Sequence, residues 1–254
     1  RKVFVELSQP TLTEDDAEAI VALAHAHDCL TIVDTVTSLG GVPVLVDAWG
    51  MDAVYSGSQK CLSCTPGLSP VTFGSAAVDR IKARKDRIQS WFMDTNLVMG
   101  YWGEGQQRSY HHTAPINPLY GLHEALLALY EEGLEASWAR HRANHHALRA
   151  GLEAMGLSLF VKEEARLPQL NAVNIPDGVD DLAVRKQLLR DFQLEIGGGL
   201  GVMAGKIWRI GLMGYASRAD NVMLCLSALE QVLGAQGARI NRGVALDAAR
   251  AVLS

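Results

Sequence analysis

Short apolar runs alternate with helical patterns in the first third of the chain. After the capping pattern that begins at Thr13, apolar positions recur with helical spacing as far as about His27 and predict an amphipathic helix. The run 30–33 is rich in β-branched residues and predicts a strand, and further short strands are expected at 53–55 and 69–73. This alternation is typical of an α/β fold with a mostly parallel sheet, in which the strand ends carry the chemistry.

The second half of the chain has longer helical patterns. Apolar positions from Pro118 to about Met155 predict one long or broken helix, interrupted at Gly133. Beyond it the pattern predicts a strand, a helix, a strand and a helix, at residues 171–175, 181–192, 207–210 and 217–233. We therefore predict a large domain over 1–135, followed by a small α+β domain over 136–254.

Composition narrows the class of protein. The 254 residues are 48% hydrophobic and 20% charged, with a net charge of −5, which argues against partners such as nucleic acid or anionic membranes. No apolar stretch approaches the roughly 20 residues of a membrane span, and the first residues do not resemble a signal peptide. Four cysteines are too few for a disulfide framework. We expect a cytoplasmic protein.

One lysine stands in an unusual setting. Lysine side chains usually lie in solvent, but Lys60 follows the small residues of Tyr55–Ser58 at the end of an expected strand. The segment Cys61–Gly67 after it is also poor in charged residues. A lysine that is removed from water can act as an amine nucleophile or form a Schiff base.

A carboxylate completes a possible pair with Lys60. Asp34 ends the run 30–33, at the edge where an α/β sheet normally exposes ligand-binding groups. Alone, an aspartate at such a place is more often a helix cap or a turn residue. Pyridoxal phosphate chemistry requires both a lysine amine and an acid beside the pyridinium nitrogen, so the two residues together suggest that cofactor.

Four segments carry a resemblance to a known family. Residues 32–41, 55–60, 110–113 and 208–211 resemble, in the same order, motifs of the class V aminotransferases, especially the alanine–glyoxylate and serine–pyruvate enzymes. The resemblance implies the fold type I architecture of pyridoxal phosphate enzymes. It also implies a homodimer with shared active sites.

The resemblance assigns four residues to the cofactor. Lys60 would carry pyridoxal phosphate as a Schiff base and would later move a proton on the substrate. Asp34 would bind the pyridinium nitrogen, Val36 would pack against the ring, and Gln59 would lie near the phosphate. No metal site is implied.

Three further residues follow from the same resemblance. Tyr110 and Thr113 would reach the phosphate of the cofactor in the partner subunit, which would make the dimer obligatory. Arg209 would bind the substrate carboxylate, a task that suits its planar fork of donors. Independently of the resemblance, a charged residue within the apolar strand 207–210 is expected to need a counter-ion.

The resemblance also implies the substrates, which would be small amino acids and 2-oxo acids. The resemblance favours transamination of alanine or serine with glyoxylate or pyruvate as acceptor. Ureidoglycine–glyoxylate aminotransferases are the alternative, because they are similar over Gly205–Tyr215, although they tend to have Asn where this chain has Tyr110. Cysteine desulfurases usually place His before the lysine, and Gln59 argues against them.

Other motifs allow other functions. Cys61 and Cys64 have the spacing of a redox pair, which leaves a non-catalytic or redox α/β module as a minor alternative, although Pro66 and Gly67 favour a loop there. His141 and His145 have i, i+4 spacing that could bind a metal, but we expect a solvated helix face.

Two polar or flexible segments near the motifs have simpler interpretations. His111 and His112 could act as acid or base, but the resemblance gives the phosphate contact to their neighbours. Gly197–Gly199 lacks the spacing of a nucleotide-binding loop, so we expect a flexible turn near the substrate.

The start of the chain departs from the family pattern. The glycine- and hydroxyl-rich loop that binds the phosphate in the family does not precede Lys60, and only Glu6–Pro10 stands near the place of another family segment. The chain also begins with Arg1 rather than Met. We expect that an N-terminal part of the large domain is missing and that these residues alone bind cofactor weakly.

Overall fold

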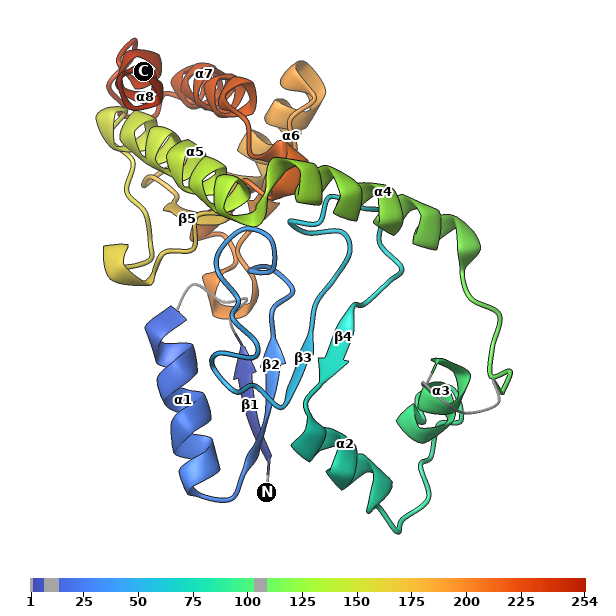
Figure 1. Cartoon of the computed structure of the whole chain (residues 1–254). Helices are drawn as coiled ribbons and strands as arrows, with labels where there is room; N and C mark the ends of the chain where they lie inside the picture. Colours follow the sequence, from blue (N-terminus) through green and yellow to red (C-terminus); the bar gives the residue numbers. More distant parts are fainter. Residues whose placement is uncertain (1, 7–13, 103–108) are drawn as a thin grey trace.

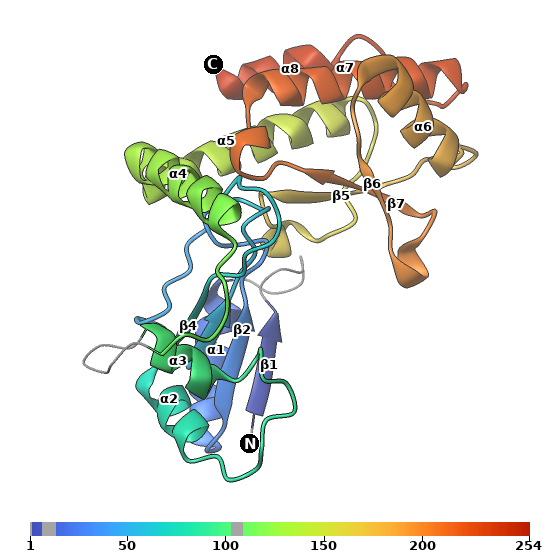
Figure 2. The same ribbon diagram turned by 90° about the vertical axis from the view of Figure 1, so that its right-hand side faces the viewer.

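The computed structural model describes residues 2–6, 14–102 and 109–254. Its elements form two lobes, one around each of two sheets (Figures 1 and 2). In chain order they are β1 Lys2–Glu6, α1 Glu14–Ala26, β2 Leu30–Asp34, β3 Ala53–Tyr55, β4 Val71–Phe73, α2 Ser75–Lys82, α3 Thr95–Trp102, α4 Ile116–Glu132, α5 Leu134–Ala154, β5 Leu170–Asn174, α6 Asp181–Phe192, β6 Gly197–Gly198, β7 Ile207–Gly211, α7 Ala219–Ala235 and α8 Ala245–Leu253. The capping residue Thr13 and residues 7–10 lie outside the described ranges.

The first sheet has the strand order β1-β2-β3-β4. The first three strands are parallel and β4 is antiparallel to β3, which confirms the prediction of a mostly parallel sheet. The register places Asp34 at the end of β2 opposite Tyr55 at the end of β3. The segments that follow these two strands therefore leave the sheet at the same edge.

One face of this sheet is covered by α1. A small apolar core forms between α1, β2 and β3, and its buried members are Ala17, Val21, Val33, Met51 and Val54. The Asp52 carboxylate next to this core accepts hydrogen bonds from the Thr31 backbone N–H at 2.8 Å and the Thr31 hydroxyl at 3.0 Å. These bonds join the start of β3 to β2 and help to fix the strand register.

The predicted long or broken helix consists of two helices. Gly133, with φ of +86°, separates α4 from α5, because a positive φ cannot continue a right-handed helix. The two helices lie between the lobes, and α5 continues into the second one (Figure 2). The boundary that we predicted after residue 135 falls in the first turn of α5 and stays a prediction.

The second lobe contains the larger core. Its antiparallel sheet has the order β5-β7-β6, and α5, α6, α7 and α8 contribute to one apolar cluster around Trp208, which is fully buried. A small α+β unit at this end of the chain was predicted. None of the helices in the described ranges is long and apolar enough to cross a membrane.

Two local expectations were wrong. Residues Gly197–Gly198 are not a flexible turn but a short strand that pairs with β7. The last helix pattern begins at Ala219 rather than at Ser217. Ser217 is fully buried, and its hydroxyl oxygen accepts a hydrogen bond from Asn144 on α5 at 3.4 Å instead of capping α7.

Candidate active site

Asp34 is held rigidly at the carboxyl end of β2. It is buried, its Oδ2 accepts a hydrogen bond from the Tyr55 hydroxyl at 2.7 Å, and its Oδ1 accepts one from the Val36 backbone N–H at 2.8 Å. These two bonds fix the direction of the carboxyl group. The residue therefore provides a rigidly oriented carboxyl group at the sheet edge.

Lys60 lies in the tight turn that follows β3, at the same sheet edge. The turn is closed by the Ser63 N–H, which donates to the Lys60 carbonyl at 2.9 Å, and by the Cys64 N–H, which donates to the Ser58 carbonyl at 3.0 Å. The Ser58 hydroxyl adds a bond to the Thr65 carbonyl at 2.7 Å. Lys60 itself is half-buried, so the turn holds an amine at the margin of the site.

Gly57 lets the other two predicted cofactor residues come close to each other. A side-chain carbon at Gly57 would lie 2.8 Å from Gln59 Oε1 and 3.4 Å from Val36 Cγ1. Val36 and Gln59 therefore both approach the backbone of Gly57, from the segments that follow β2 and β3, and a larger residue at 57 would displace the Gln59 side chain. The absent side chain at 57 thus allows both residues to lie at the same sheet edge as Asp34.

Arg209 comes from the other lobe. It lies in the middle of β7, and its Nε donates a hydrogen bond to the Gly198 carbonyl on β6 at 2.8 Å. Arg209 takes part in none of the ion pairs among the described residues, so the expected counter-ion stays a prediction that the substrate carboxylate would fulfil. The Nη groups can thus receive a carboxylate.

Tyr110 and Thr113 form a hydrogen bond with each other and not with Asp34, Lys60 or Arg209. Their hydroxyl groups are 2.8 Å apart, and the Tyr110 side chain is exposed. Both lie between α3 and α4, on a segment that the figures place away from the end of β2 (Figure 1). Within this single chain, the structure does not bring them together with Lys60.

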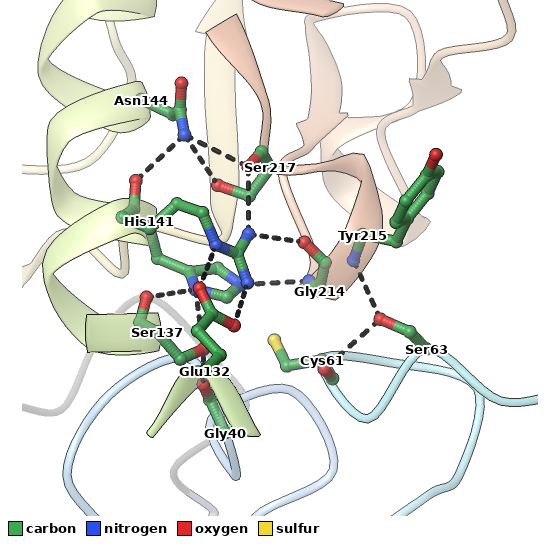
Figure 3. Close-up of polar contacts among 11 residues, drawn as sticks. Gly40, Cys61, Ser63, Glu132, Ser137, His141, Asn144, Gly214, Tyr215 and Ser217 are labelled. Carbon is green, nitrogen blue, oxygen red and sulfur yellow. Dashed lines mark hydrogen bonds and ion pairs between the residues drawn. The ribbon is translucent and has the colours of Figure 1, made fainter. Parts of the chain in front are cut away.

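His141 and His145 of α5 are buried, so the solvated helix face expected for this pair was wrong. His141 is fully buried, and its Nε2 accepts a hydrogen bond from the Gly214 N–H at 2.9 Å (Figure 3). His145 bonds through Nδ1 to Asn171 Oδ1 at 2.6 Å. Burial lowers the pKa of His141 and lowers that of His145 to about 4, so both rings are neutral at pH 7. Among the residues with described positions, no three His, Cys, Asp or Glu side chains gather as metal ligands.

The Cys61–Cys64 segment is a loop, as predicted. Cys61 is buried, and burial raises the pKa of its thiol to about 12, which suppresses the reactive thiolate. Both cysteines are free thiols. His111 is also buried, with its ring stacked on Trp91 at 4.0 Å between centroids.

Two residues near the site were missed by sequence reasoning. Tyr55 donates to Asp34, and the pairing of the two strand ends was the signal that could have revealed it. The hydroxyl of Ser63 accepts a hydrogen bond from the Tyr215 N–H at 2.7 Å. These two residues lie far apart in the chain, so no local pattern reports that contact.

Comparisons with known proteins agree with this geometry. A family model described as Aminotransferase class-V matches residues 6–220. The chain is 45% identical over 213 residues to an alanine–glyoxylate aminotransferase of Callithrix jacchus, covering 83% of this chain and 51% of the relative. It is 42% identical over 250 residues to an (S)-ureidoglycine–glyoxylate transaminase of Bacillus subtilis, covering 91% and 60%.

Solved structures give the same result. The crystal structure of a ureidoglycine–glyoxylate aminotransferase from Bacillus subtilis superposes with a TM-score of 0.94 at 41% identity, covering 99% of this chain and 65% of that one. The chain therefore spans about half to two thirds of the length of these relatives, and it has the fold type I architecture that was predicted.

The match implies pyridoxal phosphate as the cofactor, and the residues at the sheet edge fit it. Asp34 offers a fixed carboxylate, Val36 and Gln59 meet at the backbone of Gly57, and the following turn carries the amine of Lys60. Because the family model covers most of its length, this chain belongs to the class V aminotransferase family.

Proposed function

We propose that the protein transfers an amino group from a small amino acid, alanine or serine, to glyoxylate or pyruvate with pyridoxal phosphate. The observation that carries the proposal is the placement of Asp34 and the Lys60 turn at the ends of adjacent parallel strands, next to Val36 and Gln59. The names of the similar proteins support the choice of substrates.

Each residue has a separate task in this proposal. When bound, the cofactor supplies an electron-accepting ring that makes the substrate Cα–H acidic. The Asp34 carboxylate would hold the protonated ring nitrogen, Val36 would pack against the ring and Gln59 would lie near the phosphate. Lys60 would hold the cofactor through Nζ, and its amine would move the proton at the substrate Cα. Arg209 holds the substrate carboxylate through its Nη groups.

Ureidoglycine is the second candidate amino donor. The match to the Bacillus subtilis transaminase extends over 250 residues, and its crystal structure aligns with 99% of this chain, which favours this reading as much as the first. A screen of alanine, serine and ureidoglycine with glyoxylate as acceptor decides between them. If only ureidoglycine is turned over, it replaces alanine and serine as the proposed amino donor.

We also propose a cytoplasmic homodimer with shared sites. None of the residues of α4 is buried, although the helix carries several exposed apolar side chains, namely Leu119, Tyr120, Leu126, Leu127 and Tyr130. Contiguous apolar surface of this kind is typical of subunit contacts. In the dimer, Tyr110 and Thr113 would reach the phosphate in the partner subunit. Light scattering that shows a monomer at working concentration would contradict this.

The direct test replaces Lys60. Lys60→Ala should abolish both turnover and the visible absorbance of bound pyridoxal phosphate, because the amine that attaches the cofactor is gone. Lys162→Ala, at an exposed position before a short 3-10 turn, is the matched control and should behave as the unchanged chain. Transamination that survives in Lys60→Ala would reject the proposed function.

A further inference from the structure

The short 3-10 turn Gly214–Ala216 connects the two parts of the site. It follows β7, which carries Arg209, and it precedes α7. Figure 3 shows this turn between α5 on one side and the loop of Cys61 and Ser63 on the other. The turn therefore lies directly after the strand that carries Arg209.

Side chains of α5 fix one side of this turn. His141 Nε2 accepts the Gly214 N–H at 2.9 Å, and the Arg140 guanidinium donates to the carbonyls of Gly214 at 2.8 Å and Ser217 at 2.9 Å (Figure 3). His141 and Ser217 are fully buried. The turn is thus anchored to the second lobe with little freedom to move by itself.

Ser63 holds the other side. Its Oγ accepts the Tyr215 N–H at 2.7 Å and donates to the Cys61 carbonyl at 3.4 Å. A side-chain carbon at Gly214 would lie 1.9 Å from Ser63 Oγ and 2.7 Å from the Cys61 carbonyl oxygen, so this approach requires glycine at 214. The loop of Lys60 and the exit of β7 are therefore in close contact.

The backbone of Ser63 is in an unfavourable conformation. Its φ is +60°, in the left-handed region that residues other than glycine, asparagine and aspartate seldom adopt. This conformation lets the Ser63 N–H close the turn on the Lys60 carbonyl at 2.9 Å while the side chain reaches Tyr215. Strained residues of this kind concentrate at functional sites.

We propose that Ser63 is a positioning residue that sets Arg209 relative to Lys60. The proposal rests on the proposed function, in which Lys60 carries the cofactor and Arg209 binds the substrate carboxylate. Ser63 bonds to neither the Lys60 amine nor the Arg209 guanidinium. It acts through the Tyr215 N–H, which it bonds, and through the Lys60 turn, which it closes.

Two variants separate this role from backbone strain. Ser63→Ala removes the acceptor and keeps the strain, whereas Ser63→Gly removes the acceptor and relieves the strain. We expect both variants to raise KM for the amino donor about three- to tenfold, the effect of one lost hydrogen bond, with kcat and the cofactor dissociation constant within about twofold. Hydrogen exchange at the Tyr215 amide, measured without substrate, should accelerate in both.

A matched control comes from Gln193, the last residue before the loop after α6, which also has a positive φ of 52°. Gln193→Gly relieves the same kind of strain away from the site and should leave KM unchanged.

Unchanged KM in both Ser63 variants, or a change only in Ser63→Ala, would overturn the proposal. If the unchanged chain does not transaminate, the proposed function fails instead. Amide exchange then decides the role of Ser63, and protection of Tyr215 that persists in both variants overturns it.

Discussion

The guanidinium of Arg209 lies against the backbone of Gly197, where a side-chain carbon would come within 3.3 Å of Nη2. On the next residue, Gly198, a side-chain carbon would meet Arg185 at the same distance. Arg185 donates two hydrogen bonds to the Asp181 carboxylate, at 2.8 and 3.1 Å, so its positive charge is already paired with that carboxylate. Arg209 is anchored through Nε, and the missing side chain at 197 leaves space for its Nη groups.

Gly197→Ala should therefore weaken binding of the amino donor. The added methyl group has to displace the Arg209 guanidinium by a few tenths of an ångström, and charge-assisted bidentate bonds are sensitive to such shifts. We expect KM for the amino donor to rise about tenfold, while the cofactor dissociation constant stays the same. Steady-state kinetics and an absorbance titration with pyridoxal phosphate measure the two quantities.

Gly100→Ala is the control for this substitution. A side-chain carbon there would meet nothing within 4 Å, so the same chemical change adds no contact. Its kinetics should match those of the unchanged chain. An unaltered KM in Gly197→Ala would show that Arg209 does not hold the carboxylate in the proposed way.

A second prediction concerns the bond between Tyr55 and Asp34. Tyr55→Phe removes the hydroxyl that donates to Asp34 Oδ2 at 2.7 Å, and the carboxylate should then be less well oriented toward the ring nitrogen. We expect the dissociation constant for pyridoxal phosphate to increase about three- to tenfold, the effect of one lost hydrogen bond. Ser254→Ala, which removes an exposed hydroxyl after α8, is the control and should change nothing.

The fold could be predicted where apolar periodicity and turn residues agree. The helix Asp181–Phe192 and the strand Ala53–Tyr55 have the predicted bounds, because each is delimited by polar residues in its own sequence. The helix α8 was missed, although its apolar residues gather on one face and Ala245 and Ala249 are buried. Gly151 on α5 allows the backbone of Ala245 to approach closely, and that contact is not local in the sequence.

The third prediction tests the redox alternative. Because the Cys61 thiol is buried and its pKa is raised to about 12, a thiol reagent at pH 8 should label the half-buried Cys64 well before Cys61. Mass spectrometry of the native chain after timed labelling identifies the modified residue. Rapid labelling of Cys61, or a disulfide between the two residues that forms with mild oxidant, would favour the redox module.

The site was predictable only in part, for a related physical reason. Lys60, Asp34 and Arg209 stand in short segments that resemble family motifs, and the register of β2 and β3 explains how the first two share an edge. The roles of Ser63 and His141 depend on backbone groups of Tyr215 and Gly214, which are distant in the chain. A polar residue does not show in the sequence whether its partner is water or a buried amide.

The last prediction follows from the neutral ring of His145. Burial lowers its pKa to about 4 in the folded state, whereas the unfolded chain binds a proton near the usual 6.5, so stability falls as the pH drops below about 6.5. Between pH 7 and pH 5 this residue should cost about 2 kcal/mol of unfolding free energy. His145→Gln, which can still bond to Asn171 but cannot be charged, should make the pH dependence shallower by that amount in urea unfolding. His123→Gln, on the exposed surface of α4, should leave the slope unchanged, and parallel curves for His145→Gln and the unchanged chain would contradict the assignment.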